Sequence, residues 1–445
     1  MVLNADVVKE FKNSSTIHGL SRFGGPELYS RRRIIWIVLV FSAATSLVTF
    51  LVMEFIHLST YPTSTIFTKI LQNKIDFPAV TVCNLNQVKY TIAKCLTENE
   101  EGEIDKVFYA ISELALLIPD YETKSAITIP GDLLYSCALN HSHQLDDMLK
   151  YCHFKRDLVA CTDVFTPKMT EYGICYTFNE KGGKVVEAVG EVAGLRFFVN
   201  VEQDQYFFAS TIRAGIKVVL HDPAEEPLPS LRGFLVGPGL AASSSIKRSR
   251  TTTLPSPYGS CRHTSDQLTE KGSYSELTCY KRCYDEYIIK KCGCRHLFSS
   301  ANILKDTEFL QNCSCPPSCH VIKYETSLSY ASFSSDYTSN YLYSKGILPR
   351  PNYTEKNFID LRLFYNTMVE EDTREVPEKS VGGILGTLGG QMGMFIGASV
   401  LSVVEVIEFV CLLMVKGGQR VSALRRRKSD ALTDGLDLKE KTSKV

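Results

Sequence analysis

The chain has 445 residues, with 49 basic and 49 acidic side chains and a formal net charge of zero. Because no charge of one sign dominates, the composition does not favour a nucleic-acid partner or a strongly charged substrate. The hydrophobic content of 44% is ordinary, but it is unevenly distributed. Two long apolar stretches near the ends of the chain enclose residues 54–380, which are mixed and largely polar.

The first apolar stretch covers residues 34–53 and carries no charge. A helix of about 20 apolar residues is long enough to cross a bilayer. The alternative is a signal anchor or a cleaved signal peptide. Against it, the stretch starts about 30 residues into the chain and no small-x-small cleavage pattern follows.

The second apolar stretch covers residues 381–415 and is followed by several basic residues between 416 and 428. Arg31, Arg32 and Arg33 precede the first stretch. Since basic residues mark the cytoplasmic side, we predict cytoplasmic segments at 1–33 and 416–445 and an extracellular domain at 54–380. This topology suits a plasma-membrane protein.

The extracellular part is predicted to be α+β. β-branched residues favour strands, and apolar residues repeating at helical spacing favour helices. A helix at 275–291 would place Cys279 and Cys283 on one face. The expected strands are Phe77–Asn84, 172–178, 184–199, 215–221 and 321–328, and the expected helices are 104–118 and 275–291.

Fourteen of the fifteen cysteines lie between the two apolar stretches, and Cys411 lies in the second. An extracellular domain holds such a set as disulfides, whereas a cytosolic one would not. The alternative is a zinc site built from Cys292, Cys294, Cys313 and Cys315, which an oxidising compartment disfavours. The sequons at Asn140 and Asn352 are typical of a glycosylated external surface.

The second apolar stretch is rich in glycine. Five of its glycines are spaced by four, four, three and four residues and so share one helix face, which allows close helix packing. A simple GxxxG dimerisation helix is the alternative. The five are Gly382, Gly386, Gly390, Gly393 and Gly397.

Deeper in the same stretch lie Ser399, Ser402, Glu405 and Glu408, with no basic residue between 381 and 415 to pair with them. A charge inside a membrane segment costs at least ~2.5–3.5 kcal/mol and usually faces water or a partner. On one continuous helix, Ser399 and Glu408 would point in opposite directions. A break near residues 397–399 would let both line a water-filled pore, with free carbonyls for ions and the glutamates as cation-attracting rings.

The residues of this break resemble the pre-pore and filter sequence of the degenerin, epithelial sodium channel and acid-sensing ion channel superfamily. Four further segments are similar to that family, so that the resemblance spans residues 18–415. The matching segments are Gly389–Ser399, His18-Gly19, Phe77–Asn84, Tyr172–Asn179 and the cysteine-rich block Cys261–Cys319.

The resemblance implies a hand-like external domain with palm, finger, thumb, β-ball and knuckle regions. It also implies three subunits around one sodium-selective pore, and block by amiloride. By position, Gly397, Ala398 and Ser399 are the filter, with carbonyls facing the ion, and His18-Gly19 is a gating motif. Bulky residues at the position of Gly386 hold degenerins open. Tyr61 meets the thumb base, where Tyr258 replaces the usual Trp.

The same resemblance implies a set of disulfides, with Cys95–Cys137 left as a further expected pair. The pairing of Cys292 and Cys294 stays open, because their usual partners are absent. The implied bridges are Cys83–Cys175, Cys152–Cys161, Cys261–Cys319, Cys279–Cys315 and Cys283–Cys313.

Three departures concern the stimulus that opens the pore. Thr63 stands where proton-gated relatives have His, and Thr387 replaces an Asp above the pore. The thumb is short, and Asp306 and Glu308 are its only acids between Cys294 and Cys313. His57 is nearby, but as a side chain at the membrane edge rather than a proton sensor.

We therefore predict a voltage-independent channel opened by an extracellular peptide or small amphipathic molecule, or partly open at rest. A proton-gated channel is the first alternative, and a non-conducting receptor or adhesion subunit is the second. The sequence contains no catalytic motif, and we expect neither an enzyme activity nor a cofactor or metal. The expected partners are identical or homologous subunits, sodium, the ligand, amiloride and the bilayer.

Overall fold

The chain divides into two units. A helical unit is formed by Met1–Ser64 with Pro377–Val445, and a sheet unit by Thr65–Val376. The computed structural model describes residues 11, 15–16, 30–97, 130–207, 213–263, 274–292, 313–397, 399 and 401–415.

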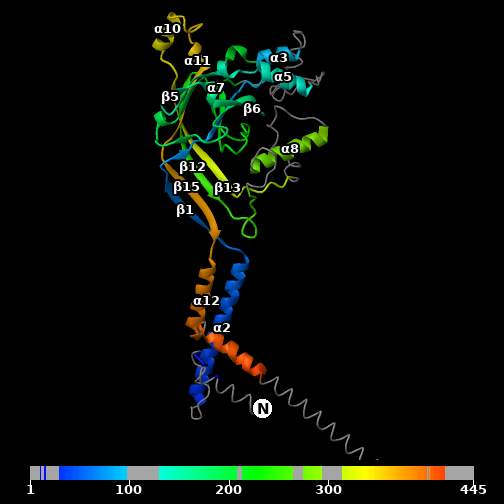
Figure 1. Cartoon of the computed structure of the whole chain (residues 1–445), viewed down its shortest axis with the longest axis vertical. Helices are drawn as coiled ribbons and strands as arrows, with labels where there is room; N and C mark the ends of the chain where they lie inside the picture. Colours follow the sequence, from blue (N-terminus) through cyan, green and yellow to red (C-terminus); the bar gives the residue numbers. More distant parts are fainter. Residues whose placement is uncertain are drawn as a thin grey trace, which may run out of the picture. The chain divides into compact units, whose positions relative to one another are not determined.

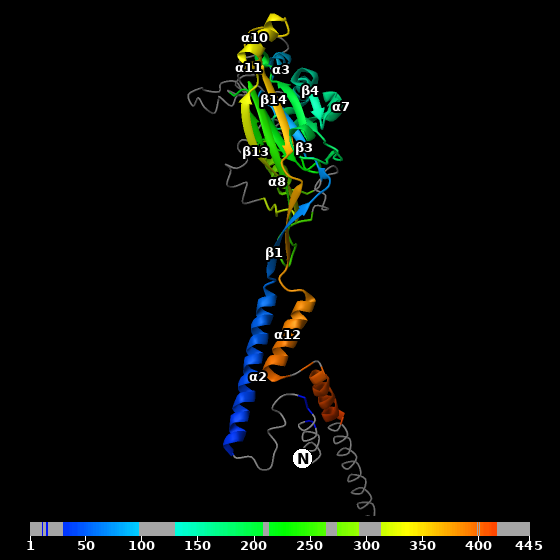
Figure 2. The same cartoon turned by 90° about the vertical axis from the view of Figure 1, so that its left-hand side faces the viewer.

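The helical unit contains helix α2 (Ser30–Ser59), helix α12 (Val381–Ile396) and a further helix, Leu401–Val415. α2 and α12 lie side by side (Figures 1 and 2), and the rings of Phe50 and Phe395 are 5.4 Å apart. Among the described residues, Ile34–Ser59 is long and apolar enough to cross a membrane, and α12 together with Leu401–Val415 would make a second, bent span.

The larger sheet of the sheet unit has eight strands in the order β1-β15-β12-β14-β9-β4-β5, with β13 also paired to β12. β12 is long enough to pair with β14 along its first half and with β15 along its second half. The strands are β1 (Thr63–Leu71), β15 (Val369–Pro377), β12 (Leu240–Thr252), β14 (Phe358–Tyr365), β9 (Leu195–Asn200), β4 (Leu149–Phe154), β5 (Asp157–Val159) and β13 (His320–Ser332).

The smaller sheet has five strands in the order β11-β10-β3-β7-β6, and β2 pairs with β8 separately. A single apolar core contains side chains from both large sheets, so the sheets pack face to face. In β9 every second residue enters this core, as the two-residue period of a strand requires. The strands are β11 (Phe234–Val236), β10 (Ile216–His221), β3 (Ala79–Asn84), β7 (Gly173–Phe178), β6 (Phe165–Thr170), β2 (Ile75–Asp76) and β8 (Val185–Val186).

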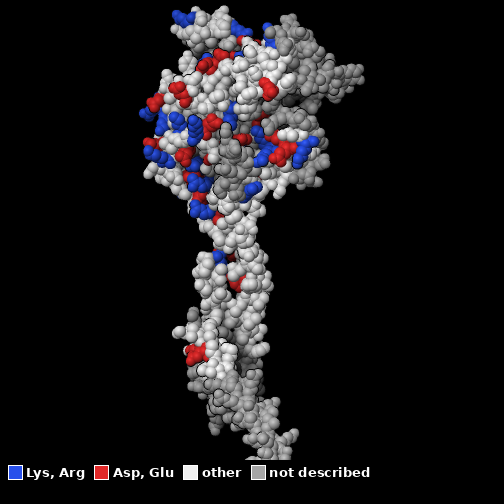
Figure 3. Space-filling model, turned by 45° about the vertical axis from the view of Figure 1, so that its right-hand side comes forward, with Lys and Arg blue, Asp and Glu red and all other residues white. Residues whose placement is uncertain are grey.

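Short helices surround the sheets. Helix α10 has Ser335 as its N-cap, whose hydroxyl accepts a hydrogen bond from the N–H of Thr338. The helices are α3 (Tyr90–Leu96), α5 (Gly131–His141), α6 (Leu145–Met148), α7 (Cys161–Val164), α8 (Glu276–Cys292), α10 (Asp336–Ser344) and α11 (Tyr353–Asn357), with 3-10 turns η4 (Glu191–Ala193) and η5 (Gln203–Gln205). Acidic and basic side chains are interspersed over the sheet unit, whereas few occur on the described part of the helical unit (Figure 3).

Most of the elements expected from the sequence are present. β3, β7, β10 and β13 coincide with four predicted strands, and α8 coincides with the helix predicted at 275–291. The single strand predicted at 184–199 is wrong: β8 and β9 are separated by Gly190, whose φ of 92° turns the chain, and by η4. The helix predicted at 104–118 lies outside the described residues.

Among the described residues, six disulfides join the elements of the sheet unit, including each bridge that the family resemblance implies and Cys95–Cys137. The i, i+4 cysteines of α8 both reach the segment before β13, which excludes the zinc site that required Cys313 and Cys315. The bridges are Cys83–Cys175, Cys95–Cys137, Cys152–Cys161, Cys261–Cys319, Cys279–Cys315 and Cys283–Cys313.

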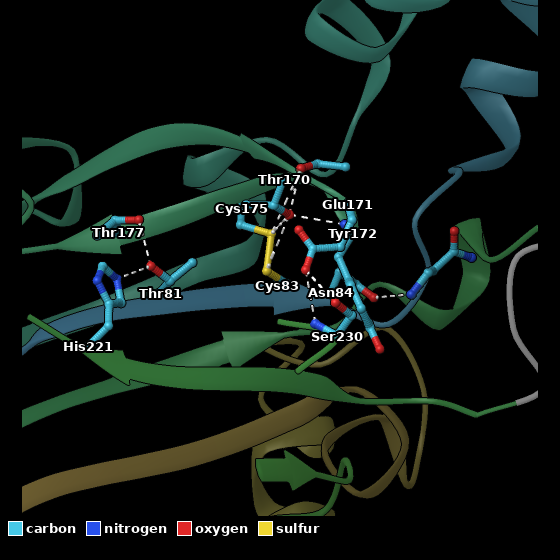
Figure 4. Close-up of a disulfide and its surroundings, with 12 residues drawn as sticks. Thr81, Cys83, Asn84, Thr170, Glu171, Tyr172, Cys175, Thr177, His221 and Ser230 are labelled. Carbon is cyan, nitrogen blue, oxygen red and sulfur yellow. Dashed lines mark hydrogen bonds between the residues drawn. A yellow bond between two sulfur atoms is a disulfide. The ribbon is translucent and has the colours of Figure 1, made fainter. Parts of the chain in front are cut away.

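A buried polar chain crosses the smaller sheet beside the Cys83–Cys175 bridge (Figure 4). The Thr81 hydroxyl lies 2.8 Å from that of Thr177 and 2.9 Å from Nε2 of His221. Nδ1 of His221 lies 2.9 Å from the carbonyl oxygen of Asp222, to which it donates when it carries the proton. Burial lowers the pKa of His221, so the folded state holds this ring neutral.

Acidification is therefore expected to destabilise the protein through His221. Below the unfolded-state pKa of about 6.5, His221 binds a proton in the unfolded chain but not in the folded state. The free energy of unfolding therefore decreases as the pH falls through that value. The loss levels off below the folded pKa, and one proton contributes a slope of at most ~1.4 kcal/mol per pH unit. Thermal unfolding of the detergent-solubilised protein across this range should show a shallower pH dependence for His221→Gln. Equal slopes for the two proteins would contradict the assignment.

Candidate functional site

The second apolar segment is broken where the sequence predicts a break. α12 begins at the N-cap Ser380, whose hydroxyl accepts from the N–H of Gly383, and it ends at Ile396. The next residue, Gly397, adopts a left-handed conformation with φ 61°, and its N–H donates to the carbonyl of Gly393. The following helix, Leu401–Val415, is inclined by 75° to α12 (Figure 2).

Ser399 and Ser402 form hydrogen bonds at the start of the second helix. The N–H of Ser399 donates to Oγ of Ser402 at 3.1 Å, and the carbonyl of Ser399 accepts from the N–H of Val403 at 3.3 Å. The Ser399 carbonyl thus already accepts one hydrogen bond, and only its second lone pair is left for an ion. The side chain of Ser399 is exposed, whereas Ser402 is buried.

The amino-terminal segment contacts this site. Oγ1 of Thr16 lies 2.6 Å from Oγ of Ser402 and donates to Oε2 of Glu405 at 3.2 Å. The N–H of Thr16 also donates to Oε2 of Glu405, at 3.1 Å. With Ser402 donating to Thr16, a continuous chain of hydrogen bonds joins the break at Ser399 to the Glu405 carboxylate.

A ring contact attaches the amino-terminal segment to a second point on the helix Leu401–Val415. The rings of Phe11 and Phe409 stack, with their centroids 4.3 Å apart. The stack lies one helical turn beyond Glu405, so both contacts attach the same segment to the same helix. Sequence reasoning missed them, because no periodicity connects residues separated by almost the whole chain.

The predicted pore residues differ in what they contact. A Cβ added to Gly386, Gly390 or Gly393 would meet nothing within 4 Å, so no other part of the described chain packs against these glycines. Glu408 is exposed, and no basic side chain pairs with it among the described residues. The glycine face of α12 and the Glu408 side chain on the following helix are therefore available to solvent or to another chain.

An ion pair and a hydrogen bond connect the ends of α2 and α12. Glu54 pairs with Lys379, and Nε2 of His57 lies 3.0 Å from Oε2 of Glu378. The N–H of Glu378 also donates to the carbonyl of Pro62. These charges cluster just beyond the apolar part of both helices, where charged side chains reach water.

The remaining predicted site residues are only partly described. Tyr61 belongs to the helical unit and has a φ of 52°, and Tyr258 belongs to the sheet unit. Asn140 and Asn352 are both exposed. His18, Gly19, Ala398 and Cys294 lie outside the described residues.

A family model described as amiloride-sensitive sodium channel matches residues 11–409. The chain belongs to the amiloride-sensitive sodium channel family. It is 28% identical to acid-sensing ion channel 1A of Danio rerio over 91% of this chain and 87% of that protein. It is 29% identical to acid-sensing ion channel 1 of Gallus gallus over 90% and 83%. The resemblance inferred from the pre-pore residues is thereby confirmed.

One solved structure, described as a proton-activated chloride channel, aligns with 85% of this chain and 98% of its own at 7% identity. Its TM-score of 0.34 is too low to bear on the pore of this protein. Membership of the amiloride-sensitive sodium channel family, by contrast, establishes the class: a membrane ion channel for sodium transport with a large disulfide-bonded extracellular domain. The class is not enzymatic.

Proposed function

We propose that this protein is the pore-forming subunit of a trimeric, voltage-independent, amiloride-sensitive and sodium-selective channel of the plasma membrane. Residues 1–33 and 416–445 are cytoplasmic in this proposal, and residues 54–380 are extracellular. The observation that carries it is the broken second segment, with the exposed Ser399 at the break and Glu405 and Glu408 beyond it. Carboxylates at membrane depth without basic partners require water, and a cation pore supplies it.

Three copies around one axis agree with the unfilled glycine face. Gly386, Gly390 and Gly393 leave open space beside α12, which a neighbouring subunit or the ion path would occupy. Repetition by symmetry would turn Glu405 and Glu408 into two rings of negative charge below the filter of Gly397, Ala398 and Ser399. The contact of Thr16 with Glu405 supports a proposed gating role for the amino-terminal segment. We assign this role to His18 and Gly19. Tyr61 and Tyr258 are proposed to couple the extracellular domain to the pore.

We infer that an extracellular peptide or small amphipathic molecule opens the channel. The alternative that requires no ligand is a channel that is partly open at rest. Thr63 and Thr387 replace the His and Asp expected for a proton-gated pore. Gating by protons is the second candidate. It is favoured by the His57–Glu378 contact and by the names of the acid-sensing relatives.

Current recording from cells expressing the chain distinguishes these stimuli. Stepping the external pH from about 7.4 to about 5, a range in which only histidine titrates at its ordinary pKa, should evoke little current. Amidated Arg-Phe peptides, or a bile-acid-type amphiphile, should then evoke a sodium current that amiloride blocks. A large transient current on acidification alone would establish the proton-gated alternative.

A further inference from the structure

An open cavity of about 640 Å³ lies within the sheet unit. It is formed where β2, the turn after β7 and the loop after β10 approach β12 and β13. Its volume is within the range of about 300–1,000 Å³ that is usual for small-molecule sites. We call it the carboxylate cavity, after Asp76, Glu180 and Asp222, which line it together with Lys181, Arg248 and Tyr324.

The buried cation of this cavity is already neutralised. Arg248 is only 7% exposed and lies 3.4 Å from Oδ2 of Asp76 and 3.6 Å from Oε1 of Glu370. Glu370 is itself buried. Asp76 therefore offsets the charge of Arg248, while Glu370 is shared with Arg250, which lies 3.2 Å from its Oε1. The Nε of Arg248 has no hydrogen-bond partner among the described residues. An anion entering here would face Asp76 as well as Arg248.

The other charges leave a carboxylate directed at the cavity. Glu180 accepts from Thr166 and from Lys168, and the Thr166 hydrogen bond, with a smaller effect of Lys168, lowers its pKa. Within the described residues, the hydrogen bond that Oδ1 of Asp222 accepts comes from the N–H of Ala224 in its own turn, at 2.9 Å, and this neighbour fixes Asp222 without neutralising it. Lys181 is an exposed lysine on a flexible stem that can extend into water.

Tyr324 lines the cavity together with Asp76 and Asp222. Burial raises the pKa of its phenol, Arg248 opposes that rise, and the negative charges of Asp222 and Asp76 both add to it. Gly182 and Gly183 also line the cavity, and a Cβ on Gly183 would meet nothing within 4 Å, so a ligand can approach the backbone there.

We propose that the carboxylate cavity binds an organic cation, an ammonium or guanidinium group, between Asp222 and Asp76 and beside the ring of Tyr324. The proposal rests on the proposed gating by an extracellular ligand and names the chemical class of that ligand. A cationic side chain of a short peptide and a polyamine both supply this group. A charge-assisted hydrogen bond to a carboxylate that is held by the backbone provides the affinity.

Labelling of an introduced cysteine tests the charge preference without any measurement of current. Ala224→Cys, combined with Cys411→Ser, places a thiol on the cavity wall of the full-length channel at the cell surface. The rates at which a cationic and an anionic methanethiosulfonate modify this thiol are measured. Each rate is divided by the rate at which the same reagent reacts with 2-mercaptoethanol in solution. We expect the cationic reagent to be favoured, and Asp222→Asn to reduce that preference about fivefold, because one unit charge is removed at close range.

Glu226→Gln is the matched control, since Glu226 is in the same loop and does not line the cavity. It should leave the ratio of rates unchanged. Asp76→Asn provides a second variant in case Asp222→Asn fails to reach the surface. Equal rates, or faster modification by the anionic reagent, would overturn the proposal, and the latter would assign the cavity to an anion at Arg248 and Lys181.

Protection from labelling identifies the source of the cation. L-argininamide should slow the modification of the introduced thiol if a peptide side chain is bound, and spermidine should slow it if a polyamine is bound. The uncharged norleucinamide should not protect, and protection by it would contradict recognition of charge. A cavity that binds these cations without any evoked current would leave this inference standing while the proposed gating fails.

Discussion

Replacing Gly397 with Ala is expected to reduce the sodium current by about 5–30-fold without removing the channel from the cell surface. Gly397 has a φ of 61°, in the left-handed region, and it ends α12 at the break. An L-residue there costs roughly 1–2 kcal/mol, and each ~1.4 kcal/mol changes an equilibrium tenfold. The side chain therefore favours a continued helix, which would turn Glu408 away from the direction of Ser399. Gly397→Val should be more damaging, because a β-branched residue tolerates this conformation least.

Gly389→Ala is the control for this prediction. Gly389 is in the same helix with helical backbone, and an added Cβ meets nothing within 4 Å. Alanine is favoured over glycine by about 0.5–1 kcal/mol in a helix, so this variant should reach the surface and conduct. Whole-cell current divided by surface-biotinylated protein gives the comparison. Equal loss in both variants would show that volume, rather than the backbone conformation of Gly397, matters.

Regular elements were predictable from the sequence where one physical rule decided them. β-branched residues indicated β3, and the i, i+4 cysteines indicated α8. The break after Ile396 followed from the opposite directions of Ser399 and Glu408 on one helix. The strand predicted at 184–199 failed because its apolar residues continue through a turn that Gly190 makes with a φ of 92°.

Contacts between distant segments could not be predicted in this way. Thr16 reaches Glu405 across 389 residues, and neither residue belongs to a repeating pattern that points to the other. The carboxylate cavity joins residues from β2, two turns, β12 and β13, and each is an ordinary polar residue in its own segment. Only the sheet order places them together, because β12 pairs with β13 along its whole length.

Replacing Ser399 with Cys is expected to make the current sensitive to thiol reagents. Ser399 is exposed at the break, and its bonds to Ser402 and Val403 use backbone atoms that the substitution leaves unchanged. A cationic methanethiosulfonate that reacts there would leave a fixed positive charge in a narrow cation path. Such a charge should block the current by about tenfold or more, since selectivity filters exclude charge of the wrong sign.

The native cysteine in the helix that follows Ser399 provides the reference for this test. Cys411 is exposed and free, so the experiment is performed with Cys411→Ser, whose own current should not respond to the reagent. An anionic reagent of the same size should react more slowly, because Glu405 and Glu408 repel it. If Ser399→Cys neither alters ion selectivity nor confers block, residue 399 does not line a conducting path. A non-conducting receptor subunit would then explain the disulfide-bonded domain better than a pore does.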